Sequence, residues 1–154
     1  MTVLVAGVGN IFLGDDGFGP EVARLLAAEP LPAAVRVVDY GIRGTHLAFD
    51  LLGGYDRLVL VDALAGGPPG ELVLLEVGPA DLGEGDTDPH GMNPVAVLAA
   101  LSRLGGTLPP PYVVGCRAAS VAEGIGLTPP VAAAVPAAVS AVRTLLGPAR
   151  RGRA

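Results

Sequence analysis

Short apolar runs alternate along the chain with longer stretches in which apolar residues recur every three or four positions. Short runs bounded by glycine, proline or aspartate are typical of buried strands, and the longer stretches are typical of amphipathic helices. The predicted strands are Val3–Ala6, Val35–Asp39, Leu58–Asp62, Glu71–Val77 and Tyr112–Cys116. The predicted helices are Pro20–Ala28, Thr45–Leu52, a helix that begins at Asn93 and Pro94, and one from Thr128 to Leu146. This alternation predicts an α/β fold.

The stretch Val3–Gly19 organises the prediction. A buried strand breaks at two glycines, and a helix follows from Pro20, a residue that suits the first turn of a helix. The loop between them holds the acidic pair Asp15 and Asp16. In doubly wound α/β folds, ligands bind at the carboxyl ends of the strands, so both aspartates lie where a functional site is expected.

The link between the third and fourth predicted strands is short. Only Ala63–Gly70 separates them, whereas a parallel crossover takes a dozen or more residues and usually a helix. The strand Glu71–Val77 is therefore predicted to run antiparallel to Leu58–Asp62, or to lie elsewhere in the sheet after a turn.

A polar loop, Gly78–Met92, delivers His90 just before the helix at Asn93. Loops of this length in small domains are commonly functional. The pattern contains no repeat and no composition shift that would mark a linker, so residues 1–148 are predicted to form one domain. Residues 149–154 are predicted to be a disordered basic tail.

Composition narrows the function classes. The 154 residues include ten arginines and no lysine, which excludes a P-loop lysine and a Schiff-base lysine. The formal net charge of −5 argues against a nucleic-acid partner. A single cysteine, Cys116, fits a reducing compartment, and the apolar N-terminal run is too short for a membrane span. A cytoplasmic protein without a membrane partner is expected.

Asp16, Asp39 and Asp62 each come just after a predicted strand, at one edge of the sheet, and the loop with His90 must return to that edge. Two carboxylates and an imidazole suit a divalent transition metal with open positions. The structural alternative is that an aspartate at a strand end caps the next helix, which applies to Asp15 and Asp16 more than to Asp62. His90 by itself also suits a structural role in its loop.

Two other kinds of site find less support. The spacing of the first glycines resembles a dinucleotide fingerprint, with Asp39 near the position of a ribose-binding acid, but Phe12 replaces the third glycine. Two loop carboxylates would also repel a pyrophosphate. No G-x-S-x-G elbow is present, and Cys116 ends a buried strand like an ordinary core residue. His46, in the Thr45 helix, is expected to be structural.

Five blocks together resemble the hydrogenase maturation endopeptidases. In the order and spacing of that family, the chain contains GVGNIFLGDDGFG, VVDYGIRG, LVLVDAL, DPHGMNP, and VVGC followed by EGIGLTPPV. The resemblance implies a three-layer α/β/α sandwich on a five-stranded, mostly parallel sheet with one antiparallel strand. It also implies an aspartic-type endopeptidase that removes a C-terminal peptide from the large-subunit precursor of a nickel–iron (NiFe) hydrogenase after nickel is installed.

The resemblance places the family's three metal-binding positions on Asp16, Asp62 and His90, and its acidic position after the second strand on Asp39. These four residues are the expected catalytic set. Arg117 follows the last strand where many members carry an acid.

The expected metal is nickel carried by the substrate, with no tightly bound metal in the free protein. Three ligands on loops, without a thiolate, make a poor closed site. The alternatives are a nickel-sensing chaperone without hydrolytic activity and a nucleotide-binding domain.

Overall fold

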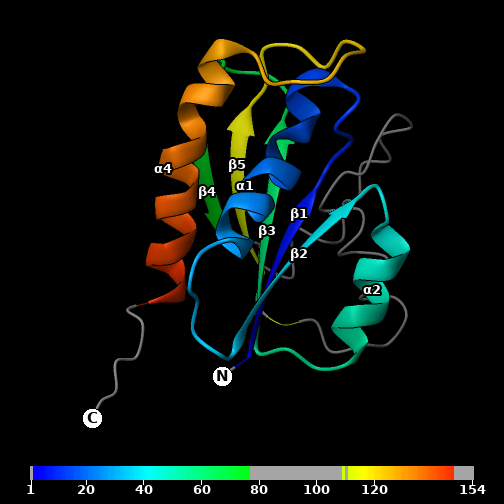
Figure 1. Cartoon of the computed structure of the whole chain (residues 1–154), viewed down its shortest axis with the longest axis vertical. Coiled ribbons are helices and arrows are strands. Elements are labelled where there is room, and N and C mark those ends of the chain that lie inside the picture. The colour runs from blue at the N-terminus through cyan, green and yellow to red at the C-terminus, as the bar shows by residue number, and fades with distance from the viewer. Residues whose placement is uncertain (1, 77–108, 110, 148–154) are drawn as a thin grey trace.

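Five strands form one sheet in the computed structural model of the chain, which describes residues 2–76, 109 and 111–147 (Figure 1). The strands are β1 (Val3–Val8), β2 (Val35–Gly41), β3 (Arg57–Leu64), β4 (Leu72–Glu76) and β5 (Pro111–Arg117). Their order across the sheet is β2-β1-β3-β5-β4. Four strands are parallel, and β4 pairs antiparallel with β5.

The predicted direction of β4 is confirmed, because β4 runs opposite to β5 and β5 runs parallel to β3. However, β4 pairs with β5 and not with β3, the strand that precedes it in the chain. β5 lies between β3 and β4, with Asp62 opposite Gly115 in one pairing and Gly115 opposite Val73 in the other. The short link after β3 therefore skips one strand position at the edge of the sheet.

Helices cover both faces of the sheet (Figure 1). Helices α1 (Phe18–Ala27) and α4 (Pro129–Leu146) lie on one face, and α2 (Gly44–Leu52) lies on the other. Successive side chains of a strand point to opposite faces of the sheet, so each strand contributes alternate residues to two hydrophobic cores, one on each face. The first core contains Val3, Val5, Phe18, Val22, Val59, Val61, Val131 and Val135 among others. The second contains Leu4, Ala6, Tyr40, Leu47, Leu58 and Leu60 among others. The predicted α/β sandwich is confirmed.

Helix α4 is long and apolar enough, by length and composition alone, to cross a membrane. Its buried residues Val131, Val135, Ala138 and Val142 belong to the core that α4 forms with the sheet and α1.

Several predicted boundaries shift. The first helix begins at Phe18 rather than Pro20 and follows a 3₁₀ turn, Gly14–Gly17. Thr45 is not a cap, because α2 begins at Gly44 with Arg43 in the capping position. Thr128 does occupy the capping position of α4, but its hydroxyl donates to the carboxylate of Asp15 and not to the backbone of the helix.

Strands β2 and β3 are longer than predicted, since Gly41 pairs with Val8 and Leu64 pairs with Arg117. Asp39 and Asp62 consequently lie two residues before the carboxyl ends of their strands, rather than at those ends. The predicted loop Gly78–Met92, the helix at Asn93 and the tail 149–154 fall outside the described residues.

Candidate active site

Asp16 is held at the carboxyl end of β1 by the turn that carries it. The N–H of Asn10 donates to Oδ2 of Asp16 at 2.8 Å, and Oδ1 of Asn10 accepts from the N–H of Phe12 at 2.9 Å. The N–H of Asp16 in turn donates to the carbonyl of Leu13 at 3.1 Å. The loop from Asn10 to Asp16 is therefore closed on itself, and it leaves the Asp16 side chain partly exposed.

Two glycines let this turn lie against the sheet. Gly9 has a φ of +140°, and a Cβ there would overlap the carbonyl oxygen of Asp16. A Cβ on Gly19, in the first turn of α1, would overlap the carbonyl oxygens of Val8 and Val61. Close backbone approach at both positions brings Asp16 to the ends of β1 and β3.

Asp62 is buried at this edge, with 3% of its surface exposed. Oδ1 accepts a hydrogen bond from the N–H of Ala63 at 2.8 Å. Burial, and then the negative charge of Asp16, raise the pKa of Asp62 well above its usual range. The buried carboxylate of Asp62 thus lies near the partly exposed, like-charged carboxylate of Asp16, an arrangement that a cation would stabilise.

Asp15, the neighbour of Asp16, has a different role. Oδ1 accepts from the N–H of Thr128 at 2.7 Å, and Oδ2 accepts from the Thr128 hydroxyl at 2.8 Å and from the N–H groups of Ala119 and Ser120 at 2.8 and 3.1 Å. Burial alone would raise the pKa of Asp15, but these hydrogen bonds outweigh it and lower the pKa below 3.8. Asp15 ties the loop after β5 to the turn that carries Asp16.

The pattern of strands and loops does not separate Asp15 from Asp16, and only the family resemblance places a ligand on Asp16. Neighbouring residues of a helical turn point in directions roughly 100–120° apart, so the side chains of two adjacent aspartates are expected to face different surroundings. Asn10, which orients Asp16, was not singled out.

Asp39 reaches the same edge from β2 but on the other face of the sheet. It lies two residues after Val37, which packs against the α1–α4 core, whereas Asp62 lies two residues after Leu60 of the α2 core. Strand β1 separates their two strands, and Gly7 pairs with both Asp39 and Val61. Asp39 is exposed, and its Oδ1 accepts from the N–H of Gly41 at 2.9 Å. The structure therefore brings Asp16 and Asp62 together and leaves Asp39 apart from them.

The two histidines differ in what the structure says of them. His90 lies outside the described residues. His46 is exposed on α2, with its ring against Tyr40 at a centroid distance of 5.9 Å, which fits the structural role expected for it. Within the described residues, no three His, Cys, Asp or Glu side chains gather closely enough to hold a metal.

Arg117 has a structural contact in this protein. Its Nε donates to Oε1 of Glu71 at 2.9 Å, and its Nη1 donates to the carbonyls of Ala65 and Gly66 at 3.3 and 3.4 Å. The arginine thereby fastens the turn between β3 and β4 to the end of β5.

Cys116 is fully buried in the core, and burial together with the charge of Asp15 raises the pKa of its thiol. We expect Ellman's reagent to leave the native protein unlabelled and to label one thiol after denaturation. Cys116→Ser is expected to lower the free energy of unfolding by about 1–3 kcal/mol, because a hydroxyl replaces the thiol in an apolar site. Rapid labelling of the folded protein would contradict this assignment.

The sequence is similar to proteins of one family over most of its length. The sequence model of the hydrogenase maturation proteases matches residues 20–144. The hydrogenase 2 maturation protease of Escherichia coli is 35% identical over 152 residues, which cover 95% of this chain and 91% of that protein. The coenzyme F420 hydrogenase subunit delta of Methanothermobacter thermautotrophicus is 30% identical and covers 94% of both chains.

Solved structures agree. The hydrogenase maturating endopeptidase HybD of E. coli superposes with a TM-score of 0.82 at 31% identity, covering 95% of this chain and 92% of that one. A hydrogenase 2 maturation peptidase from a Thaumarchaeota archaeon superposes with a TM-score of 0.74 at 34% identity, covering 96% and 99%.

Proposed function

The chain belongs to the hydrogenase maturation protease family, whose members are endopeptidases acting on the C-terminus of a NiFe hydrogenase large subunit, and from this premise we propose that Asp16 and Asp62 bind the nickel that the precursor carries. Membership in a protease family favours an enzyme over the nickel-sensing chaperone and the nucleotide-binding domain considered from the sequence. The proposal concerns how the substrate is recognised and cut.

The observation that carries the proposal is the buried carboxylate of Asp62 beside Asp16. A carboxylate that is 3% exposed and faces a second negative charge is destabilised in the free protein, as the raised pKa of Asp62 reflects. A divalent cation brought to these oxygens neutralises both charges at once. This arrangement supports a cation-binding role for the two carboxylates.

His90 is the proposed third ligand, on the strength of the family pattern DPHGMNP. With Asp16 and Asp62 it makes a set of two oxygens and one nitrogen, which leaves coordination positions to be filled by the substrate. Nickel already seated in the precursor can share these positions, and the scissile bond is then held at the edge of the sheet. The free protein is expected to hold metal weakly.

Asp39 is proposed to hold the substrate peptide. Its carboxylate is exposed on the other face of the sheet, and β1 lies between its strand and that of Asp62, so it can contact a peptide without joining the nickel ligands. The buried, protonated thiol of Cys116 offers no nucleophile, so the carboxylates of the site and a water molecule would do the hydrolysis. This is the sense in which the enzyme would be aspartic-type.

We also propose that the protein acts in the cytoplasm on the large-subunit precursor. A single buried, free cysteine suits a reducing compartment. The precursor is the expected partner, and its nickel site the expected point of contact.

The test is to incubate the protein with nickel-loaded and nickel-free precursor from the same organism and to weigh the products. The nickel-loaded precursor is expected to lose its C-terminal extension, and the nickel-free precursor is expected to remain intact. A chelator too weak to strip the seated nickel is kept in both reactions to remove free metal.

Equal cleavage of both precursors would refute recognition of substrate-borne nickel. A stoichiometric metal retained by the free protein through chelation would instead identify an ordinary metallopeptidase. Intact precursor in both reactions, with nickel-dependent binding, would restore the chaperone alternative.

A further inference from the structure

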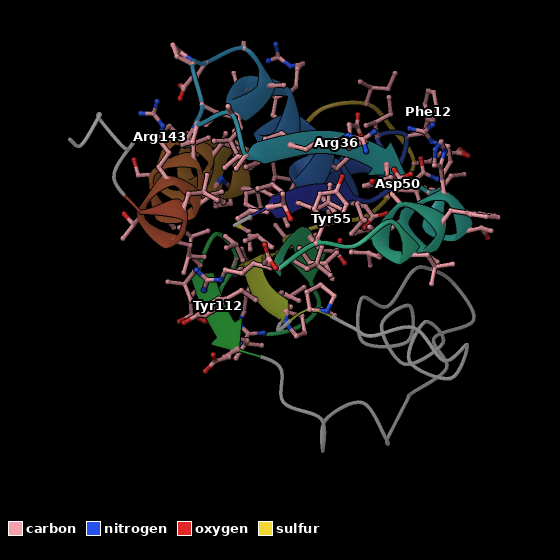
Figure 2. All side chains as sticks on the ribbon, turned by 90° about the horizontal axis from the view of Figure 1, so that it is seen from below. Phe12, Arg36, Asp50, Tyr55, Tyr112 and Arg143 are labelled. Carbon is pink, nitrogen blue, oxygen red and sulfur yellow. The ribbon has the colours of Figure 1, made fainter. Side chains whose placement is uncertain are left out.

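Large apolar side chains gather at the edge of the sheet that carries Asp16 and Asp62. We call them the apolar rim, and they are Ile11, Phe12, Ile42, Val121 and Ile125, each between 46% and 76% exposed. They come from the segments after β1, β2 and β5, and Figure 2 shows Phe12 at the end of the molecule toward which the β2 arrow points. Single exposed apolar residues are ordinary, but a cluster beside a functional site marks a binding surface.

Two of the three rim segments are fastened to each other. The N–H of Gly14 donates to the carbonyl of Gly124, and the N–H of Gly124 donates to the carbonyl of Phe12, both at 2.8 Å. The N–H of Asp15 donates to the carbonyl of Ser120 at 3.0 Å, and the Asp15 carboxylate adds its four hydrogen bonds. These two rim segments are therefore pre-organised, so binding to them costs less ordering entropy than it would on mobile loops.

Two grooves lie beside the rim, and Ile11 and Asp39 line both of them. One, of about 310 Å³, lies between Gly9–Phe12 and Asp39–Arg43. The other, of about 620 Å³, crosses α1 from Asp39 to Ile125–Leu127. A further hollow lies at the opposite end of the strands, around Pro32 and Gly147, away from the carboxylate pair. Because their linings share Ile11 and Asp39, the first two grooves together form one path along this edge of the sheet.

We propose that this path binds the C-terminal extension of the large-subunit precursor as an extended, largely apolar peptide, with its apolar side chains against the rim. The proposal rests on the proposed function, which places the scissile bond at Asp16 and Asp62. The chain beyond that bond must leave over the adjoining surface. The larger groove is lined by Gly14 and Gly17, on either side of Asp16 in its turn. The smaller groove is lined by Asn10, whose N–H donates to the Asp16 carboxylate. A free chain end can enter grooves of this size, whereas the folded body of a protein cannot. Exposed Asp39, at the junction, is placed to contact the peptide.

The experiment compares Phe12→Ser and Ile42→Ser with Phe49→Ser and Leu52→Ser. The control residues are apolar, 67% and 54% exposed, lie on α2 and line neither groove. Each variant is measured for the affinity of a fluorescent synthetic peptide that copies the extension, and for kcat and KM with nickel-loaded precursor. Melting temperatures confirm that all four variants fold.

Each rim variant is expected to raise the Kd of the peptide and the KM of the precursor about tenfold, the effect of losing most of one buried apolar side chain, with kcat nearly unchanged. The controls are expected to match the parent protein. Unchanged peptide affinity in both rim variants would overturn the proposal.

A second comparison uses the mature large subunit, which lacks the extension. If the rim variants weaken its binding as much as they weaken precursor binding, the rim docks the body of the subunit and the proposal is wrong. Peptide affinity is measured without cleavage, so it is independent of the nickel test above. Loss of nickel dependence with intact rim effects would count against the proposed function alone.

Discussion

Asp62→Asn is expected to abolish processing of the precursor while stabilising the metal-free protein. A ligand that neutralises charge at the reacting bond contributes several kcal/mol, so we expect a rate loss of at least about 10³-fold. Asp16→Ala and His90→Ala are expected to lose processing in the same way. Product mass over time gives the rate, and Asp56→Asn, at an exposed carboxylate far from the site, is the matched control. Processing at the parent rate by any of the three variants would show that its residue is not a ligand.

The stability gain in Asp62→Asn should depend on pH. Burial and the charge of Asp16 raise the folded-state pKa of Asp62 above 3.8, so the carboxylate destabilises the fold at pH values above that raised pKa. As the pH falls through the raised value toward 3.8, Asp62 takes up a proton in the folded protein and the penalty disappears. The melting temperature of Asp62→Asn should therefore exceed that of the parent at neutral pH, and the difference should vanish near pH 4. An asparagine variant less stable than the parent at neutral pH would contradict this account.

Asp15→Ala is expected to be the most destabilising single substitution of an acid in the described structure. It removes an acceptor that is fully buried and leaves the N–H groups of Ala119, Ser120 and Thr128 without their partner. Losing these hydrogen bonds costs up to about 1–3 kcal/mol each, and water that reaches the exposed Ala119 and Ser120 recovers part of that cost, so we expect a loss of roughly 3–5 kcal/mol. For a chain of this size that corresponds to a fall of roughly 10 °C in melting temperature.

The matched control is Glu123→Ala, which removes an exposed acid from the same loop and is expected to change the melting temperature little. The pKa of Asp15 is lowered in the folded state, so its contribution is present above pH 3.8 and is lost as the pH falls through the lower folded value. A melting temperature of Asp15→Ala within one or two degrees (about 1 kcal/mol or less) of the parent would show that the loop is held by other contacts.

The processing rate of Asp15→Ala distinguishes a residue that only holds the loop in place from one that takes part in hydrolysis. Because Asp15 touches the loop after β5 and not the carboxylate pair, the variant measured well below its melting temperature should retain some activity where Asp62→Asn has none. A complete loss in a fully folded Asp15→Ala would mean that the loop itself contacts the reacting bond.

The strands and the site edge could be predicted because they depend on local pattern. Continuous apolar runs such as Leu58–Asp62 are buried on both faces whatever surrounds them, and parallel strands bring their carboxyl ends to one edge. The reversed direction of β4 also followed from the chain alone, since eight residues cannot cross over. The family's order of motifs then singled out Asp16, Asp39, Asp62 and His90 without any coordinates.

Three features were decided only by the tertiary structure. The position of β5 between β3 and β4 depends on its pairing with β3, whose residues lie some fifty positions earlier in the chain, and no local pattern encodes such a pairing. The family pattern selects Asp16 as a ligand, but the structural role of Asp15 depends on the loop after β5, whose N–H groups donate to its carboxylate. Asp39 and Asp62 were set on opposite faces because alternation specifies only that successive side chains diverge, and the helices packed on each face decide which side each carboxylate occupies.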